Sequence, residues 1–125
     1  MGGLDLQISG RVALVCGSSN GLGKACATAL AKAGVHVTIN GRDEQRLDAA
    51  RLEIEGATGA RIDAVIGDVT IADGRGRVLD VCTEPDILIN NAAGPPPGNF
   101  EDWGEEEWAT AVGANMISPI QMIRA

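Results

Sequence analysis

The fold is decided by the stretch Val12-Ala13-Leu14-Val15-Cys16-Gly17-Ser18-Ser19-Asn20-Gly21-Leu22-Gly23-Lys24. Its first part is an apolar run rich in aliphatic residues, which predicts a buried strand. A glycine-rich turn follows at once and opens into a helix whose first residues are small. This layout suits a phosphate group, because a helix N-terminus offers unpaired N–H groups and a partial positive charge.

Three glycines in the turn have the spacing G-x-x-x-G-x-G, and each has a physical reason to be there. Gly17 lets the chain leave the strand, Gly21 removes a Cβ where a pyrophosphate would approach, and Gly23 lets helix and strand pack closely. The spacing differs from the usual dinucleotide motif G-x-G-x-x-G. It also differs from a Walker loop, since Ala25 stands where the magnesium-binding Ser or Thr would be.

Length and composition limit the possible functions. With 125 residues, 45% of them hydrophobic, residues 1–125 are expected to form a single domain with its own core. The net charge of −7 argues against nucleic acid and against an anionic membrane surface as partners. We expect a cytoplasmic protein, because no signal peptide or bilayer-spanning run is found and the three cysteines lie within apolar periodic segments as core residues.

Apolar periodicity predicts strands that alternate with helices. Strands are expected at residues 11–16, 35–40, 61–67 and 86–90, and helices at about 22–33, 44–56, 71–82 and from 105 onward. Gly34 is placed to end the first helix. Asp43 is placed to cap the second, and the region from Gly56 to Gly59 is placed to close it. Right-handed βαβ units then give a Rossmann-type, doubly wound parallel sheet of order 3-2-1-4, an α/β fold.

Ligands of such a sheet bind at the carboxyl ends of its strands, beside the point where the strand order reverses. Four segments of this chain map to that edge: the glycine turn, Gly41-Arg42, Asp68, and residues 90–94. We therefore expect a nucleotide site there. The alternative is a purely structural role, in which Asp68, Asn90 and Asn91 only form turns.

The motifs Cys16-Gly17-Ser18-Ser19-Asn20-Gly21-Leu22-Gly23 and Asn90-Asn91-Ala92-Ala93-Gly94 resemble those of the short-chain dehydrogenase/reductase family. That family carries Thr-Gly-x-x-x-Gly-x-Gly after its first strand and Asn-Asn-Ala-Gly after its fourth. The resemblance extends over essentially the whole chain. The proline loop with Phe100 and Trp103 looks like members that are 3-oxoacyl-acyl-carrier-protein reductases.

The resemblance implies a dinucleotide cofactor and a small-molecule carbonyl or alcohol substrate, in a protein that forms homo-oligomers, usually tetramers. Asp68 and Val69 would contact the adenine ring, and Asn90, Ala92 and Gly94 would line the adenosine ribose and the nicotinamide side. The full set of cofactor-binding residues is then Gly17, Ser18, Ser19, Asn20, Gly21, Leu22, Gly23, Gly41, Arg42, Asp68, Val69, Asn90, Ala92 and Gly94.

The end of the second strand favours NADP(H) over NAD(H). NAD enzymes place an acidic residue there for the ribose 2′-hydroxyl, whereas an Arg accommodates a 2′-phosphate. Here Gly41 occupies the place of the acid and Arg42 follows it. An Arg that is merely solvated in a loop is the alternative, and Asn20 stands where many NADP-using relatives carry a basic residue.

The resemblance also aligns Asn115 with the family's helix asparagine, the first member of its Asn-Ser-Tyr-Lys catalytic set. Pro119 has no N–H, so the carbonyl of Asn115 lacks its usual partner four residues later. We hypothesise that this carbonyl holds a water in a proton relay. The alternative is a proline kink with a polar residue in a helix groove.

The remaining members of that catalytic set are not found. The chain contains no tyrosine, and its only lysines, Lys24 and Lys32, belong to the first helix. We therefore expect the N-terminal portion of a longer reductase, truncated before its later strands and inactive by itself. A non-catalytic dinucleotide-binding module is the alternative. No metal site is expected, because the single histidine, His36, has no second ligand clustered near it.

Overall fold

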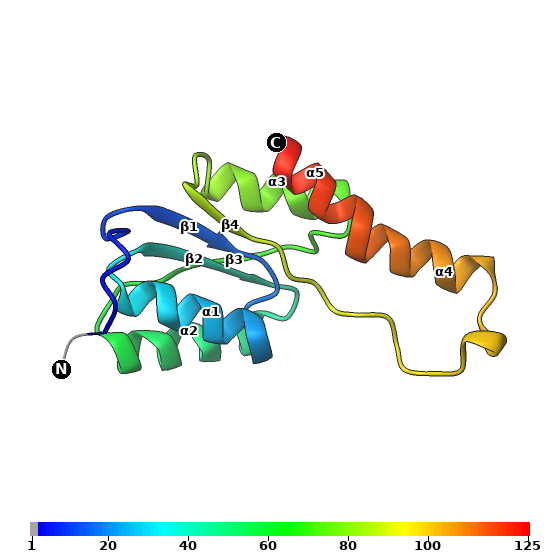
Figure 1. The fold of residues 1–125 in the computed structure, drawn as a ribbon, viewed down its shortest axis with the longest axis horizontal. Helices are drawn as coiled ribbons and strands as arrows, with labels where there is room; N and C mark the ends of the chain where they lie inside the picture. The colour runs from blue at the N-terminus through cyan, green and yellow to red at the C-terminus, as the bar shows by residue number, and fades with distance from the viewer. Residues whose placement is uncertain (1–2) are drawn as a thin grey trace.

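A computed structural model describes residues 3–125. Within these residues the strands form a parallel sheet of order β3-β2-β1-β4 (Figure 1), which confirms the predicted Rossmann-type α/β fold. The strands are β1 (Val12–Val15), β2 (His36–Gly41), β3 (Asp63–Ile66) and β4 (Ile87–Ile89). β1, β3 and β4 lie inside the segments predicted for them, whereas β2 extends one residue past its predicted end, to Gly41.

The register brings the carboxyl ends of the strands to one edge of the sheet. Val15 pairs with Ile39 of β2 and with Ile89 of β4. At the opposite edge Asp86 fixes the start of this register, since its Oδ2 accepts a hydrogen bond of 2.8 Å from the N–H of Val12. The turn after β1 therefore emerges beside the ends of β2 and β4.

Helices cover both faces of the sheet. Figure 1 shows α1 (Gly21–Lys32) and α2 (Glu44–Thr58) on one face and α3 (Ala72–Val81) and α5 (Ser118–Arg124) on the other. Successive residues of β1 point to opposite faces, so each face has its own apolar cluster. One contains Ala13, Val15, Ile39, Leu47 and Ile54, and the other contains Leu14, Cys16, Val78, Cys82 and Met122.

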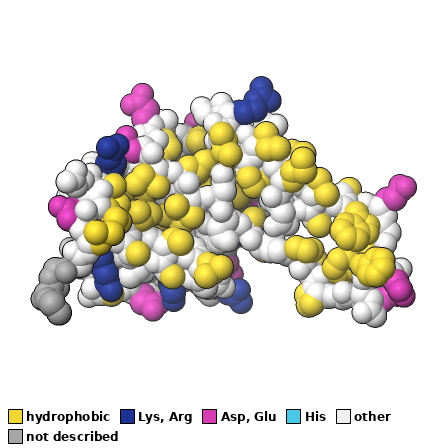
Figure 2. All heavy atoms as spheres, in the orientation of Figure 1, with side chains coloured by type: hydrophobic (Ala, Val, Ile, Leu, Met, Phe, Trp, Pro, Cys, Tyr) yellow, Lys and Arg dark blue, Asp and Glu magenta, His cyan; other side chains and the backbone are white. Residues whose placement is uncertain are grey.

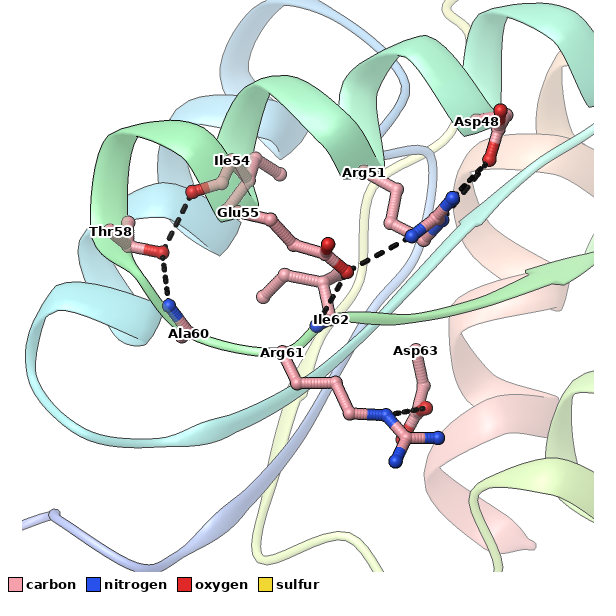
Figure 3. Close-up of polar contacts among 9 residues, drawn as sticks. All are labelled: Asp48, Arg51, Ile54, Glu55, Thr58, Ala60, Arg61, Ile62 and Asp63. Carbon is pink, nitrogen blue, oxygen red and sulfur yellow. Dashed lines mark hydrogen bonds and ion pairs between the residues drawn. The ribbon is translucent and has the colours of Figure 1, made fainter.

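The predicted ends of α2 are confirmed. The Asp43 carboxylate accepts a hydrogen bond of 2.9 Å from the N–H of Arg46, and Gly59 ends the helix in the left-handed region at φ 70°. The junction with β3 is drawn in Figure 3. There Glu55 bonds both to the Arg51 guanidinium and to the N–H of Ile62, and so ties the end of α2 to the start of β3.

The helix α1 buries a stripe of very small residues, Gly23, Ala27 and Ala31. The apolar periodicity of the sequence includes Leu22, but its side chain is 81% exposed. The face of α1 that is buried is therefore the one with Gly23, Ala27 and Ala31, and not the more hydrophobic face that contains Leu22. Small residues lie against the sheet because α1 packs directly on the glycine turn.

The helix predicted at about 71–82 is present as α3, and its residue Gly74 has a packing role. A Cβ on Gly74 would lie 1.9 Å from the carbonyl oxygen of Asp68. A side chain is therefore excluded at the point where α3 starts against the turn after β3. By contrast, among the described residues no atom lies within 4 Å of a Cβ placed on Gly76.

The chain after β4 runs out from the sheet before it returns (Figure 1). An extended stretch leads to η1 (Phe100–Asp102), then to α4 (Glu105–Val112), the π-helical turn η2 (Gly113–Ile117) and α5. Trp103 and Trp108 pack edge to face, with ring centroids 5.5 Å apart.

One side of α4, η2 and α5 exposes apolar side chains, visible toward the right of Figure 2. They include Trp108, Val112, Met116, Ile120 and Ile123. Among residues 3–125 we find no helix with both the length and the apolarity needed to cross a membrane.

Candidate functional site

The glycine turn presents the N-terminus of α1 at the carboxyl edge of the sheet. Gly17 and Gly21 adopt left-handed backbone angles, with φ of 57° and 54°, which favour glycine. Among the described residues, no side chain caps this helix end and its first turn holds no acidic residue. The N–H groups and partial positive charge are thus available to an anion.

The turn is held from inside by Ser18, which is fully buried. Its hydroxyl donates to the carbonyl of Val15 at 2.7 Å, and its N–H donates to the carbonyl of Asn40 at 2.8 Å. Both polar groups of Ser18 therefore bond within the protein. The contact of Ser18 with a cofactor stays a prediction. The more exposed part of the turn consists of Ser19, Asn20, Gly21 and Leu22.

Asn91 holds the turn from the side of β4. Its side-chain Nδ2 donates a hydrogen bond of 2.9 Å to the carbonyl oxygen of Gly17. Asn91 lies in the predicted segment 90–94 but is not in the set of cofactor-binding residues proposed from the sequence. The signal that could have found it is its place directly after a strand that pairs with β1, where a side chain can reach the turn.

Gly23 lies beneath this contact. A Cβ on Gly23 would lie 2.2 Å from the carbonyl oxygen of Gly17 and 2.9 Å from Nδ2 of Asn91. The close packing expected of Gly23 is confirmed, because the Gly17 carbonyl and the Asn91 amide leave no space for a side chain there.

A second corner of the site is formed where β2 ends. Gly41 is buried, and a Cβ there would lie 3.4 Å from the Cβ of Ser19 and 3.4 Å from Cδ1 of Leu47. Arg42 follows and is exposed. An exposed arginine therefore directly follows the glycine that packs against Ser19, and its charge acts on the nearby Asp68. A guanidinium at such a place can bind a phosphate.

Asp68 lies in the turn that follows β3. Its Oδ1 accepts hydrogen bonds from the N–H of Thr70 at 2.9 Å and from the hydroxyl of Thr70 at 2.6 Å. Partial burial raises the pKa of the Asp68 carboxyl, but these bonds and the nearby charge of Arg42 outweigh it, so the pKa lies below its ordinary value. The turn-forming role is therefore real, and the adenine contact stays a prediction.

The next residue, Val69, joins this turn to two helices. Its carbonyl accepts a hydrogen bond from the guanidinium of Arg75 in α3 at 3.0 Å and another from the hydroxyl of Ser118 in α5. The loop that carries Asp68 and Val69 is thus fixed to the helix that follows Asn115.

A cavity of about 170 Å³ opens between the end of β4 and the helical segment around η2. Its lining is mostly small and polar: Cys16, Val69, Asn90, Asn91, Ala92, Ala114, Asn115, Ser118 and Pro119. Burial, with a smaller effect of nearby Cys82, raises the pKa of the Cys16 thiol to about 11, so this thiol stays protonated at neutral pH.

Asn115 lies in the π-helical turn and faces this cavity. Its Nδ2 donates to the carbonyl of Ala111 at 3.0 Å, and the N–H of Ser118 donates five residues back to the carbonyl of Gly113. The expected disturbance of the helix before Pro119 is therefore a local widening of the helix, a feature frequent at functional sites. The water relay proposed for the Asn115 carbonyl stays a prediction.

The structure brings most of the predicted site residues to one edge of the sheet. The glycine turn, Gly41-Arg42, Asp68-Val69, and the pair Asn90 and Ala92 all lie at carboxyl ends of strands. Gly94 lies farther along the extended stretch, is exposed, and is not one of the residues that line the cavity. Within residues 3–125, no cluster of three or more His, Cys, Asp or Glu side chains is arranged to hold a metal.

Comparisons with known proteins agree with this geometry. A family model described as short chain dehydrogenase matches residues 11–125. The chain is 32% identical over 123 residues to the uncharacterized oxidoreductase YvaG of Bacillus subtilis, covering 97% of this chain and 46% of YvaG. It is 34% identical to dehydrogenase/reductase SDR family member 4 of Rattus norvegicus, covering 94% of this chain and 44% of that protein.

Among solved structures, the chain is similar to L-sorbose reductase from Gluconobacter frateurii in complex with NADPH and L-sorbose. The TM-score is 0.90 at 30% sequence identity, covering 97% of this chain and 48% of that one. The chain thus spans about half the length of the relatives it matches.

Proposed function

Because this chain belongs to the short-chain dehydrogenase/reductase family, we propose that it forms the NADP(H)-binding part of an oxidoreductase. The reaction would transfer a hydride between the cofactor and a carbonyl or alcohol substrate. What supports this function most directly is one juxtaposition: the uncapped N-terminus of α1 lies at the same sheet edge as the exposed Arg42. Two separate places for phosphate groups are then available.

The residues present fit the diphosphate of a dinucleotide. Gly21 is exposed, and among the described residues no atom lies within 4 Å of a Cβ placed on it, so a phosphate can approach the backbone there. Asn20, Gly21 and Leu22 would hold the diphosphate through backbone N–H groups. Gly17 and Gly23 would shape the turn. Ser18 would support the turn from inside, and Ser19 would flank the diphosphate.

The end of β2 fits NADP(H) better than NAD(H). Gly41 offers no carboxylate to accept from a ribose 2′-hydroxyl, whereas Arg42 offers two N–H groups to a 2′-phosphate. The NADPH that accompanies the similar L-sorbose reductase supports the same preference. Asp68 and Val69 would then face the adenine, with NAD(H) as the less favoured cofactor.

The cavity beside Asn115 would hold the nicotinamide end and the reacting group of the substrate. When bound, the nicotinamide supplies or accepts the hydride. Asn90, Ala92 and Gly94 would line the adenosine ribose and the nicotinamide side, and the carbonyl of Asn115 would hold a water that relays the substrate's proton. Asn115 is the catalytic residue that we assign to this chain, because the family resemblance aligns it with the catalytic asparagine. The free carbonyl is expected because Pro119 offers it no N–H.

The substrate class is a carbonyl compound or the corresponding alcohol, with a 3-oxoacyl thioester as a candidate from the family resemblance and a keto sugar as a candidate from the similar L-sorbose reductase. The 125 residues alone are proposed to be inactive, since they contain no tyrosine to move the proton by the family's route. The family match favours a reductase over a non-catalytic nucleotide-binding module.

The test is a steady-state assay of the protein as its gene encodes it, with NADPH and a panel of keto sugars, 3-oxoacyl thioesters and simple ketones. Consumption of NADPH that depends on one of these substrates supports the proposal. Tight NADPH binding without turnover on any of them would instead favour the non-catalytic module.

We also propose that the protein is a homo-oligomer. The exposed apolar side chains of α4, η2 and α5 support an additional packing partner, because an apolar surface of that extent is unfavourable in water. Sedimentation equilibrium would test this, and a monomer at micromolar concentration would contradict it.

A further inference from the structure

Asn40 is a buried polar residue that neither the sequence motifs nor the proposed chemistry uses. It lies near the end of β2, and only 1% of its surface is exposed. A buried amide is costly unless its polar groups are bonded, so its contacts are informative.

The side chain of Asn40 reaches toward β3. Its Nδ2 donates to the carbonyl of Val65 at 3.1 Å and to the carbonyl of Gly67 at 2.9 Å. Both amide hydrogens are thereby used. Gly67 is the residue before Asp68, so the amide fixes the start of the turn that we propose contacts the adenine.

The same residue also holds the glycine turn. Its N–H donates to the hydroxyl of Ser18 at 2.9 Å, and its carbonyl accepts from the N–H of Ser18 at 2.8 Å. Its Oδ1 accepts a longer bond of 3.4 Å from the N–H of Gly17. Asn40 is therefore bonded on one side to the phosphate turn and on the other to the adenine turn.

We infer that Asn40 is a positioning residue that sets the spacing between the diphosphate and adenine subsites of the cofactor site. This inference rests on the proposed function. In a dinucleotide the ribose joins the adenine to the diphosphate and limits the distance between them. The cofactor therefore binds well only when the two turns are held at the matching separation. A ligand that occupies one turn alone has no such requirement.

The amide is well suited to this role because it offers donors and an acceptor from one small side chain. Leucine has a similar volume but would remove the side-chain donor from the carbonyls of both Val65 and Gly67. An aspartate would place negative oxygens against those two carbonyls.

The experiment compares three ligands on the protein as its gene encodes it: NADPH, adenosine 2′-monophosphate and inorganic pyrophosphate. In Asn40→Leu, we expect the Kd for NADPH to rise at least about tenfold and the Kd for each smaller ligand to rise less than about threefold. The matched control is Thr38→Val, a buried polar residue on the same strand, which should leave all three Kd values within about twofold of wild type.

A merely structural role would weaken all three ligands equally, as would partial unfolding. That result, or NADPH affinity in Asn40→Leu within about threefold of wild type, would overturn the inference while leaving the proposed function intact. A wild-type protein that binds no NADPH would overturn both.

Should Asn40→Leu not fold, the wild-type protein provides the test. The N–H of Gly67 donates to the carbonyl of Gly41 at 3.0 Å, and its hydrogen exchange can be followed by NMR. Pyrophosphate alone should slow this exchange at least about threefold, although it contacts only the glycine turn. An unchanged exchange rate at saturating pyrophosphate would contradict the inference.

Discussion

The side-chain amide of Asn91 donates a hydrogen bond of 2.9 Å to the carbonyl oxygen of Gly17, across 74 positions of sequence. This bond closes the glycine turn against the end of β4. It also explains why residue 23 has no side chain, because a Cβ there would meet both partners of the bond. The phosphate turn and the end of the fourth strand thus form one packed unit.

The first prediction concerns this unit. In Gly23→Ala, the added Cβ would lie 2.2 Å from the Gly17 carbonyl oxygen, so the turn must shift. We expect the free energy of unfolding to fall by about 2 kcal/mol and NADPH affinity to fall with it. Urea unfolding and a fluorescence titration measure the two effects.

The control for that variant is Gly56→Ala in the last turn of α2. Among the described residues no atom lies within 4 Å of a Cβ at Gly56, so alanine should raise the free energy of unfolding by about 0.5 kcal/mol. Equal effects of the two substitutions would show that Gly23 is not constrained as the structure indicates.

A second prediction concerns the choice between cofactors. In Gly41→Asp, the new Cβ would be in contact with Ser19 and Leu47 at 3.4 Å, a space that needs only small adjustments. The carboxylate would accept from a ribose 2′-hydroxyl and repel a 2′-phosphate. We expect NADPH affinity to fall about tenfold or more while NADH affinity rises. An unaltered ratio of the two affinities would place the 2′ position elsewhere.

A third prediction follows from the lowered pKa of Asp68. Thr70→Val removes the hydroxyl bond to the carboxylate, so the wild type should be more stable than the variant while Asp68 is ionised. A depressed folded-state pKa contributes stability that is present above the unfolded pKa of about 3.9 and is lost as pH falls through the folded value. We expect the stability difference to be constant near neutral pH and to shrink below about pH 4.

Thr58→Val is the matched control for the pH series. The Thr58 hydroxyl donates to the carbonyl of Ile54 and accepts from the N–H of Ala60, and neither partner ionises. Its stability difference from wild type should therefore not vary with pH. If Thr70→Val behaves in the same way as Thr58→Val, the assigned carboxylate contact is wrong.

A fourth prediction concerns thiol reactivity. Burial raises the pKa of Cys16 to about 11 and also raises the pKa of Cys82, whereas Cys26 is only half-buried. Alkylation of the native protein at about pH 8 should therefore modify Cys26 first. Peptide mass analysis over time measures the order, and modification of Cys16 as fast as Cys26 would mean that the end of β1 is not closed.

Much of the fold could be predicted because local signals agree with it. Asp43 and Gly59 mark the ends of α2, and the apolar run before Gly17 predicts a strand covered on both faces. Strand order followed from the handedness of βαβ units. The edge that carries the site followed from the same rule.

What the sequence could not provide are contacts between distant residues. The bonds from Asn91 to Gly17 and from Asn40 to Gly67 link positions whose pairing depends on strand register. Hydrophobic periodicity also misplaced the buried face of α1, because Leu22 is exposed while Gly23 is buried. A glycine counts as a weak helix former in sequence, although close packing can require it.

The central claim is that the edge formed by the glycine turn and Arg42 binds NADP(H). Parallel titrations of the protein with NADPH and NADH, in wild type and in Arg42→Ala, test it most directly. We predict that wild type binds NADPH at least about tenfold more tightly than NADH, and that Arg42→Ala loses most of this difference while its NADH affinity is unchanged. Equal or tighter binding of NADH by wild type, or binding of neither cofactor, would contradict the account.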